Sequence, residues 1–266
     1  MERIFFADSW QKFFAELGLK SFDDFFEYPG MERMRRNKKR HVSIFNLGNG
    51  PNRKEFFLKR FCYPYFKDMF FAFRNFGRLC SQAACEWENA NLLLDKGIRT
   101  YKPVCYGEQI KCGLERKSFF VSEKLQSQHF TDFVVQNWSQ FNWSQKGKII
   151  IALAKLIREV HDEAIRLPDL YVWHIFIKED EVPDKWNFAF IDLHRMDRSV
   201  KNPNKKIEDL GRLYWSMSDK YFDDKLKDLF VQSYMSDDWP GSKTALVRAI
   251  QRRVNILAKR RKLKDY

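Results

Sequence analysis

The spacing of apolar residues changes along the chain and divides it into three parts. In the first part, four apolar residues recur at helical spacing: Trp10, Phe13, Phe14 and Leu17. Gly18 followed by Ser21 indicates the end of one helix and the N-cap of another, over residues 22–28. Residues 1–35 are therefore predicted to form a helical N-terminal extension.

The second part, residues 36–125, has mainly the pattern of strands. Alternating apolar residues predict strands at 41–46, 54–61, 104–108 and 118–125. The first two flank the turn sequence Gly48-Asn49-Gly50-Pro51. A basic, aromatic stretch of helical period follows at 64–79, and a further helix at 81–96 ends at Gly97. This part is predicted to be a β-rich lobe with an amphipathic helical insert at 64–79.

The third part, residues 126–266, is mainly helical. Periodic segments predict helices at 130–137, 146–161, 204–217, 220–235 and 242–262. Two apolar runs, 167–177 and 187–195, are joined by a polar turn as a hairpin. A strand-rich lobe followed by a helical lobe predicts a two-lobed α+β fold, in which a ligand would bind between the lobes.

Composition limits the classes of protein. With 266 residues, 44% of them apolar and 17% aromatic, the chain is expected to be globular rather than disordered. The net charge is +13, and the last turns hold many of the cations: Arg248, Arg252, Arg253, Lys259, Arg260, Arg261, Lys262 and Lys264. Such a surplus attracts nucleic acid, anionic lipid headgroups or a phosphorylated glycolipid, or it is simply a solvated helix end.

The cysteines and the apolar runs predict the cellular compartment of the protein. Five cysteines form no C-x-x-C pair, and their odd number argues against a disulfide framework, which favours the reduced cytosol. The N-terminus does not have the pattern of a signal peptide, and no window reaches the roughly 18 consecutive apolar residues of a membrane span. The protein is therefore expected to be cytoplasmic, either soluble or peripheral on a membrane.

Asp169 and Asp192 indicate chemistry, because each lies at one end of an apolar run of the hairpin. This is the layout of a kinase catalytic loop and its metal-binding aspartate. Asp169 is predicted to accept the proton of a substrate hydroxyl, and Asp192 to bind Mg²⁺ that bridges the phosphates of ATP. His174 occupies the position of the kinase asparagine and could ligate the metal or contact a phosphate; the alternative is a satisfied histidine in a strand.

The β-rich lobe offers the remaining parts of a kinase site. Lys59, at the end of an apolar strand segment, is the candidate for binding the phosphates. Glu86 is its predicted partner and Glu88 the rival, since residues two apart on a helix point about 200° apart. Backbone groups from Glu123 to Leu125, where a strand ends, are expected to contact adenine.

Asp209 is a further candidate. It is similar to the buried aspartate of kinase C-lobes that hydrogen-bonds the backbone of the catalytic loop. The alternative is an acid near a helix N-terminus, where the helix dipole favours negative charge.

These residues resemble the lipopolysaccharide kinase family, the bacterial heptose and Kdo kinases of the lipopolysaccharide core. The likeness covers about residues 20–220 and is carried by 57–59, 85–90, 95–100, 118–123 and 169–174. The most specific stretch is Ile191-Asp192-Leu193-His194-Arg195, which stands where protein kinases have Asp-Phe-Gly. The resemblance implies a protein-kinase-like fold, ATP with Mg²⁺, and transfer to a sugar hydroxyl of the inner core, heptose or Kdo.

The chain departs from the family at the catalytic aspartate. The family usually has His-Arg-Asp, but this chain has Leu167-Pro168-Asp169. Pro168 either holds the loop in place of the arginine or marks a weakened activity. A pseudokinase scaffold, a kinase for another acceptor, and a membrane- or nucleic-acid-binding module therefore stay open as alternatives.

The resemblance also gives the basic segments a use. An acceptor in the cytoplasmic leaflet of the inner membrane implies an anionic surface, on which the 66–78 helix and the 248–264 tail could dock. Packing within the lobe is the alternative for that helix. Nucleic acid is not expected as a partner, and the oligomeric state, the sugar and the hydroxyl stay open.

Overall fold

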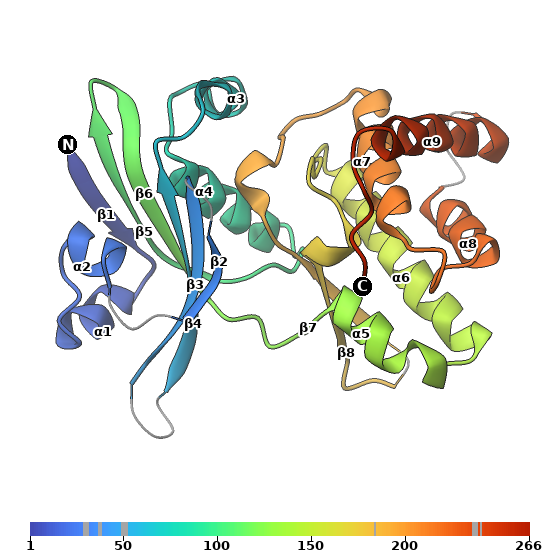
Figure 1. Cartoon of the computed structure of the whole chain (residues 1–266), viewed down its shortest axis with the longest axis horizontal. Helices are drawn as coiled ribbons and strands as arrows, with labels where there is room; N and C mark the ends of the chain where they lie inside the picture. Colours follow the sequence, from blue (N-terminus) through green and yellow to red (C-terminus); the bar gives the residue numbers. More distant parts are fainter. Residues whose placement is uncertain (29–31, 37–38, 49–52, 184, 236–238, 240) are drawn as a thin grey trace. The chain divides into compact units, whose positions relative to one another are not determined.

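The computed structural model describes residues 1–28, 32–36, 39–48, 53–183, 185–235, 239 and 241–266 (Figure 1). It is an α+β structure, as predicted, and divides into two compact units. The first unit is Met1–Leu125 together with Leu193–Arg195, and the second is Gln126–Asp192 together with Met196–Tyr266. Within the described residues, no helix combines the length and apolar character needed to cross a membrane.

The first unit is built on a six-stranded antiparallel sheet with the order β1-β5-β6-β4-β3-β2. Its strands are β1 (Glu2–Phe6), β2 (Glu32–Arg36), β3 (Arg40–Leu47), β4 (Lys54–Cys62), β5 (Pro103–Lys111) and β6 (Leu114–Glu123). The four predicted strands are confirmed, each within a few residues. Of the predicted turn at Gly48-Asn49-Gly50-Pro51, residues 49–51 lie outside the described residues.

Residues 1–35, predicted as a helical N-terminal extension, contain strands as well as helices. Two short helices are present, α1 (Trp10–Glu16) and α2 (Phe22–Phe26), but β1 and β2 flank them. β1 pairs along its whole length with β5, about a hundred residues away in the sequence. A five-residue strand fixed by so distant a partner leaves little signal in its own local pattern.

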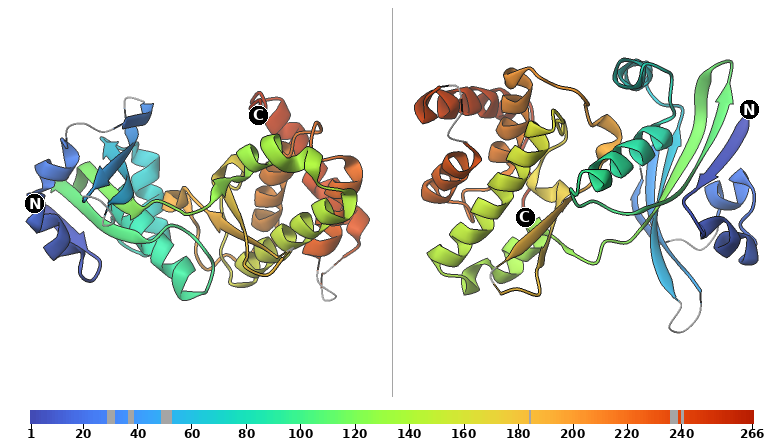
Figure 2. Two further views of the ribbon diagram at one scale, coloured as in Figure 1. Left: turned by 90° about the horizontal axis from the view of Figure 1, so that it is seen from below. Right: turned by 180° about the vertical axis from the view of Figure 1, so that it is seen from behind.

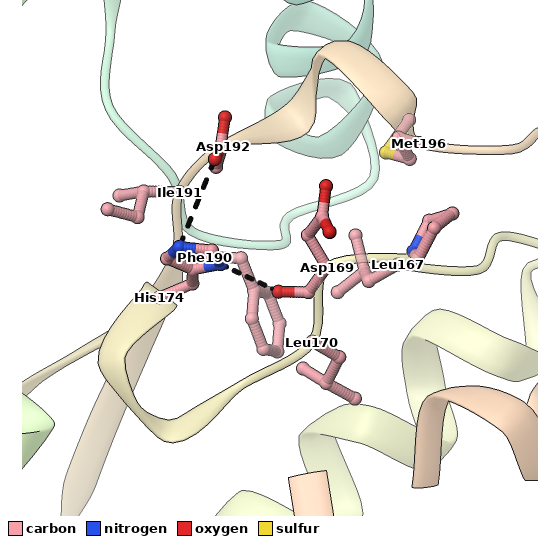
Figure 3. Close-up of a pocket in the computed structure, with 9 residues that line it drawn as sticks. Leu167, Asp169, Leu170, His174, Phe190, Ile191, Asp192 and Met196 are labelled. Carbon is pink, nitrogen blue, oxygen red and sulfur yellow. Dashed lines mark hydrogen bonds and ion pairs between the residues drawn. The ribbon is translucent and has the colours of Figure 1, made fainter. Parts of the chain in front are cut away.

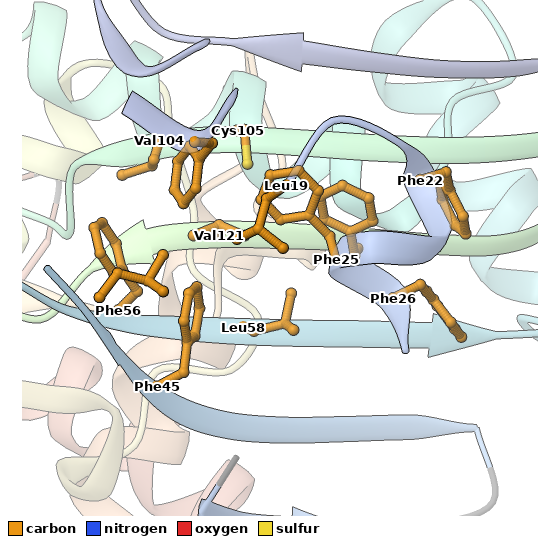
Figure 4. Packing of buried hydrophobic residues seen from close by; sticks show 13 residues of the cluster. Leu19, Phe22, Phe25, Phe26, Phe45, Phe56, Leu58, Val104, Cys105 and Val121 are labelled. Atoms are coloured by element: carbon orange, nitrogen blue, oxygen red, sulfur yellow. The ribbon is translucent and has the colours of Figure 1, made fainter. Parts of the chain in front are cut away.

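Helices cover both faces of the first sheet (Figure 2). On one face α1 and α2 form an aromatic core with the strands (Figure 4), whose buried members include Phe14, Phe22, Phe25, Phe45, Phe56, Leu58, Phe119 and Val121. On the other face lie α3 (Phe66–Phe76) and α4 (Gln82–Asp95). Because successive residues of a strand alternate between faces, Phe56 and Leu58 point to the aromatic core and Lys59 points to α4.

The second unit is mainly helical, as predicted. Its helices are α5 (Phe130–Asn137), α6 (Trp143–Asp162), α7 (Pro203–Ser216), α8 (Asp224–Tyr234) and α9 (Lys243–Ala258). α8 begins later than predicted because Asp223 caps it, accepting a hydrogen bond from the Leu226 amide at 2.8 Å. A small sheet of β7 (Gln128–His129), β8 (Ile175–Glu179) and β9 (Trp186–Phe190) completes the unit.

The predicted hairpin is confirmed, since β8 pairs antiparallel with β9. The first apolar run, however, is a strand only from Ile175 onward. Residues 167–174 form a loop that ends in a short 3-10 helix, η3 (Val172–His174). The Val172 amide donates to the hydroxyl of Ser216 in α7, at 2.9 Å, instead of to a neighbouring strand. This side-chain bond keeps an apolar segment out of the sheet.

Candidate active site

The loop before β8 and the end of β9 form a small pocket in the second unit (Figure 3). Asp169, His174 and Asp192 bring polar atoms to it. Its other lining residues are Leu167, Pro168, Leu170, Phe190, Ile191 and Met196. The three polar residues that the sequence predicted for the catalytic loop and the metal site thus lie in one pocket.

His174 links the two aspartates. Its Nδ1 lies 2.8 Å from the backbone carbonyl oxygen of Asp169, and its Nε2 lies 3.9 Å from Oδ2 of Asp192. A carbonyl oxygen only accepts, so Nδ1 must carry the proton and donate. Burial lowers the pKa of His174, although the charge of Asp192 acts in the opposite direction. A neutral His174 therefore directs the lone pair of Nε2 toward the Asp192 carboxylate.

The backbone aims Asp192 away from the path of β9. Asp192 has φ +66°, in the left-handed region that few residues other than glycine adopt. Aspartate tolerates this conformation better than most side chains do. The chain therefore turns directly after β9, and the Asp192 carboxylate lines the pocket (Figure 3).

Asp209 holds the start of the loop that carries Asp169. Its Oδ2 accepts a hydrogen bond from the Leu167 amide at 2.8 Å, and its side chain is fully buried. Asp209 is the seventh residue of α7, so the alternative of an acid at a helix N-terminus is wrong. Burial alone would raise the pKa of Asp209, but the neighbouring His161, whose Nε2 lies 3.7 Å from Oδ2 of Asp209, and the charge of Arg166 outweigh it and lower that pKa.

Arg166 is a residue that the sequence interpretation missed. Its Nη2 lies 2.9 Å from Oδ1 of Asp209, and its Nη1 lies 3.7 Å from Oδ2 of Asp197. The interpretation considered only the position before Asp169, which holds Pro168. The arginine two positions earlier anchors the loop to α7 instead. The only local signal was a cation within an otherwise apolar run.

In the first unit, Lys59 and Glu86 form a buried ion pair across β4 and α4. Lys59 is 8% exposed and Glu86 is fully buried. The hydroxyl of Tyr101 also donates to Oε1 of Glu86. Glu88 points elsewhere and pairs with Arg78, so Glu86 rather than its rival is the partner of Lys59. The contribution of Tyr101 was not visible in the sequence, because it depends on the path of the chain after α4.

Glu86 also fixes the segment that follows Asp192, residues Leu193–Arg195. The amides of Leu193 and His194 donate to its two oxygens at 3.3 and 3.1 Å. Asn89, one turn along α4, donates from Nδ2 to the Leu193 carbonyl at 2.7 Å. The motif that carries the family resemblance is therefore hydrogen-bonded to the residue predicted to hold Lys59.

Glu123 and Leu125, the predicted adenine-contacting segment, lie at the end of β6. The Glu123 amide donates to the Lys102 carbonyl at 3.0 Å, and the Lys124 amide donates to the Glu55 carbonyl at 3.0 Å. These bonds fix the direction of the chain there. Leu125 is the last residue of the first unit before the chain enters the second.

Comparisons with known proteins agree with this arrangement of motifs. A family model described as "Lipopolysaccharide kinase (Kdo/WaaP) family" matches residues 32–234. The chain belongs to this lipopolysaccharide kinase family. The resemblance inferred from the motifs is therefore confirmed.

Curated relatives in the family are named lipopolysaccharide core heptose(I) kinase WaaP. The protein from Pseudomonas aeruginosa PAO1 is 26% identical over 154 residues, which are 56% of this chain and 58% of that protein. The protein from Escherichia coli K12 is 29% identical over 140 residues, 49% of this chain and 51% of that protein. The matches therefore span about half the length of these relatives.

A solved structure titled "WaaP in complex with acyl carrier protein" has a similar fold. Its TM-score is 0.72 at 18% identity, with 96% of this chain and 98% of that chain covered. At this identity the comparison shows the fold alone.

Proposed function

We propose that this protein is an ATP-dependent kinase with a two-lobed, protein-kinase-like fold. It would transfer the γ-phosphate to a sugar hydroxyl of the lipopolysaccharide inner core, on heptose or Kdo. The observation that carries this proposal is the pocket in which Asp169 and Asp192 lie on either side of His174. Membership in the lipopolysaccharide kinase family supports lipopolysaccharide as the proposed acceptor.

Asp169 is the proposed proton acceptor. As the sugar oxygen bonds to the γ-phosphorus, the bond from that phosphorus to the β,γ-bridging oxygen breaks, and ADP leaves. The hydroxyl proton passes to the Asp169 carboxylate. The hydrogen bond from the Leu167 amide to Asp209, which also pairs with Arg166, supports this role, because a general base must be held within hydrogen-bonding distance of its substrate.

Lys59 and Glu86 would act on the phosphates of ATP. The Lys59 ammonium offers positive charge and three donors, and Glu86 fixes its position. Backbone groups from Glu123 to Leu125 are the proposed contacts for adenine. The burial of Glu86 supports the role given to the Lys59–Glu86 pair, since a fully buried carboxylate is stabilised by the donors around it rather than by water.

Asp192 and His174 are the residues that would hold Mg²⁺. The carboxylate of Asp192 suits a hard cation, and the lone pair of His174 Nε2 is directed to the same place. Magnesium prefers oxygen to imidazole nitrogen, so Asp192 fits better than His174. When bound, the metal would neutralise negative charge on the transferring phosphate.

The test is transfer of labelled γ-phosphate from ATP to lipopolysaccharide that lacks core phosphates. Asp169→Asn should lower turnover by about 10²–10⁴-fold with ATP binding nearly unchanged, because the base is removed and the fold is kept. Asp192→Ala should abolish transfer. Asp180→Asn, in the turn between β8 and β9, is the matched control and should transfer normally.

The other outcomes separate the alternatives. ATP binding without transfer by the wild type would indicate a pseudokinase or a kinase for another acceptor. Full activity of Asp169→Asn would refute the base assignment. A wild type that binds no ATP would refute the kinase proposal as a whole.

We also propose that α3 brings the enzyme to the anionic cytoplasmic face of the inner membrane. Three phenylalanines one or two turns apart are exposed: Phe66 by 77%, Phe70 by 62% and Phe73 by 51%. Met69 and Ala72 point the other way and are buried, so packing in the lobe uses one face of α3 and leaves the other apolar and exposed. A contiguous apolar face on a cationic protein suits a surface of anionic lipid.

A further inference from the structure

The residues that follow α9 return to the catalytic loop. Arg261 donates from Nη1 to the hydroxyl oxygen of Tyr171 at 2.8 Å. The ammonium of Lys264 lies 4.4 Å from the centroid of the Trp173 ring. Tyr171 and Trp173 belong to the loop between Asp169 and His174. Two cations that the sequence assigned only to a basic tail are therefore in contact with the segment that carries the candidate base.

The two aromatic rings form a stack within this loop. The centroids of Tyr171 and Trp173 are 4.8 Å apart, and their planes differ by 8°. Trp215 of α7 meets both rings edge-on, with centroid distances of 6.1 and 6.2 Å. Aromatic pairs and cation–π contacts of this kind are attractive and favour one arrangement of the rings. The stack is thus held by α7 and by the segment after α9.

Tyr266 secures the same segment to α7. Its hydroxyl donates to the Ser216 carbonyl at 2.5 Å and accepts from the Ser218 amide at 3.0 Å. Burial raises the pKa of Tyr266 to about 12, so the hydroxyl keeps its proton at neutral pH. Ser216 also bonds the loop directly, through the Val172 amide. One residue of α7 therefore ties together the loop and the segment that crosses it.

We propose that residues 261–266 brace the catalytic loop, with Arg261 and Lys264 as positioning residues for Asp169. This inference rests on the proposed kinase function and adds that the basic segment serves the reaction as well as any surface. A shift of about 1 Å at a reacting group can cost about 10²-fold in rate, so loss of the brace should lower turnover.

The test compares two double variants that each lose two positive charges from the same segment. Arg261→Ala/Lys264→Ala should lower kcat about tenfold or more while the KM for ATP changes by less than about twofold. Arg260→Ala/Lys262→Ala, which changes two exposed neighbours, should keep the wild-type kcat. Arg261→Lys in place of Arg261→Ala should restore part of the lost kcat, because the lysine ammonium can still donate to the Tyr171 hydroxyl.

Hydrogen exchange gives a readout that does not depend on activity. Peptides covering residues 167–176 should exchange faster in Arg261→Ala/Lys264→Ala than in the wild type, and Tyr266→Phe should show a smaller increase. Wild-type kcat together with wild-type exchange in Arg261→Ala/Lys264→Ala would overturn the brace. A wild-type protein that binds no ATP would refute the kinase proposal, whereas faster exchange in the variant would still support the brace.

Discussion

Two buried glutamates in the first unit have different surroundings. Glu86 accepts hydrogen bonds from the Lys59 ammonium, the Tyr101 hydroxyl and two backbone amides. Glu115 in β6 accepts from the Gln82 amide at 2.9 Å and from the Ser118 hydroxyl at 2.6 Å, which are both neutral donors. A buried carboxylate that stays ionised without a compensating positive charge costs free energy of folding. Glu115 is therefore the residue at which stability should depend on pH.

Burial raises the pKa of Glu115 from 4.5 to about 7, against the effect of its two hydrogen bonds. Because the folded-state pKa is raised, the contribution of Glu115 to stability is complete below pH 4.5 and is lost as the pH rises through about 7. The shift corresponds to about 3 kcal/mol. Thermal unfolding should show stability falling from pH 5 to pH 8.

Glu115→Gln should remove this dependence, because an amide keeps the shape and does not ionise. Its oxygen can accept from the Gln82 amide, and its NH₂ group can donate to the Ser118 hydroxyl. The variant should be more stable than the wild type at pH 8. Glu2→Gln, an exposed change on the same sheet, is the control and should follow the wild type. Equal pH dependence in Glu115→Gln and wild type would contradict the assignment.

At the scale of elements, β5 and β6 depend on one glycine. Gly107 stands opposite Phe119 in the antiparallel register, and the Phe119 ring lies over it in the core beneath α2. A Cβ on Gly107 would approach within 2.6 Å of Cζ of that ring. The aromatic core therefore needs a residue without a side chain at this position.

Gly107→Ala should destabilise the first unit by about 1–3 kcal/mol, because Phe119 must leave its position among the buried aromatics. Urea denaturation would measure this as a lower midpoint with an unchanged slope. Gln109→Ala, two residues along the same strand, is the control. Stability equal to the wild type in Gly107→Ala would show that the ring can move freely.

Helical elements were predicted well because their apolar residues repeat locally. The loop at 167–174 was not, since its shape depends on side chains of α7 and on residues after α9. Ser216, Asp209 and Arg261 lie 42 to 90 residues away from their loop partners. The bond from Asp209 to the loop backbone was predicted from the sequence, whereas the contacts of Ser216 and Arg261 with the loop were not.

At the scale of the molecule, the net charge of +13 has more than one use. Arg261 donates to the Tyr171 hydroxyl and Lys264 lies over the Trp173 ring. Arg248 and Arg252 on α9 are exposed, as Arg261 and Lys264 are. Charge alone would attract any polyanion, and the proposed docking of the apolar face of α3 would add a preference for lipid.

Replacing Phe66, Phe70 and Phe73 together by serine should weaken binding to vesicles of anionic phospholipid at least about tenfold, because three rings no longer enter the interface. Co-sedimentation with vesicles would measure the effect. Val182→Ser, which changes an exposed apolar residue of the second unit, is the control. Unchanged binding of the triple variant would remove α3 from the membrane proposal.

The chain passes from the second unit to the first between Asp192 and Leu193. A trans peptide bond keeps the two Cα atoms about 3.8 Å apart, whatever the rest of the molecule does. The backbone of Leu193 is hydrogen-bonded to Glu86 and Asn89 of α4. Asp192 is therefore one peptide bond away from a residue that is fixed to that helix. The backbone position of the residue proposed to hold the metal is therefore limited by the hydrogen bonds that Glu86 and Asn89 make to its neighbour.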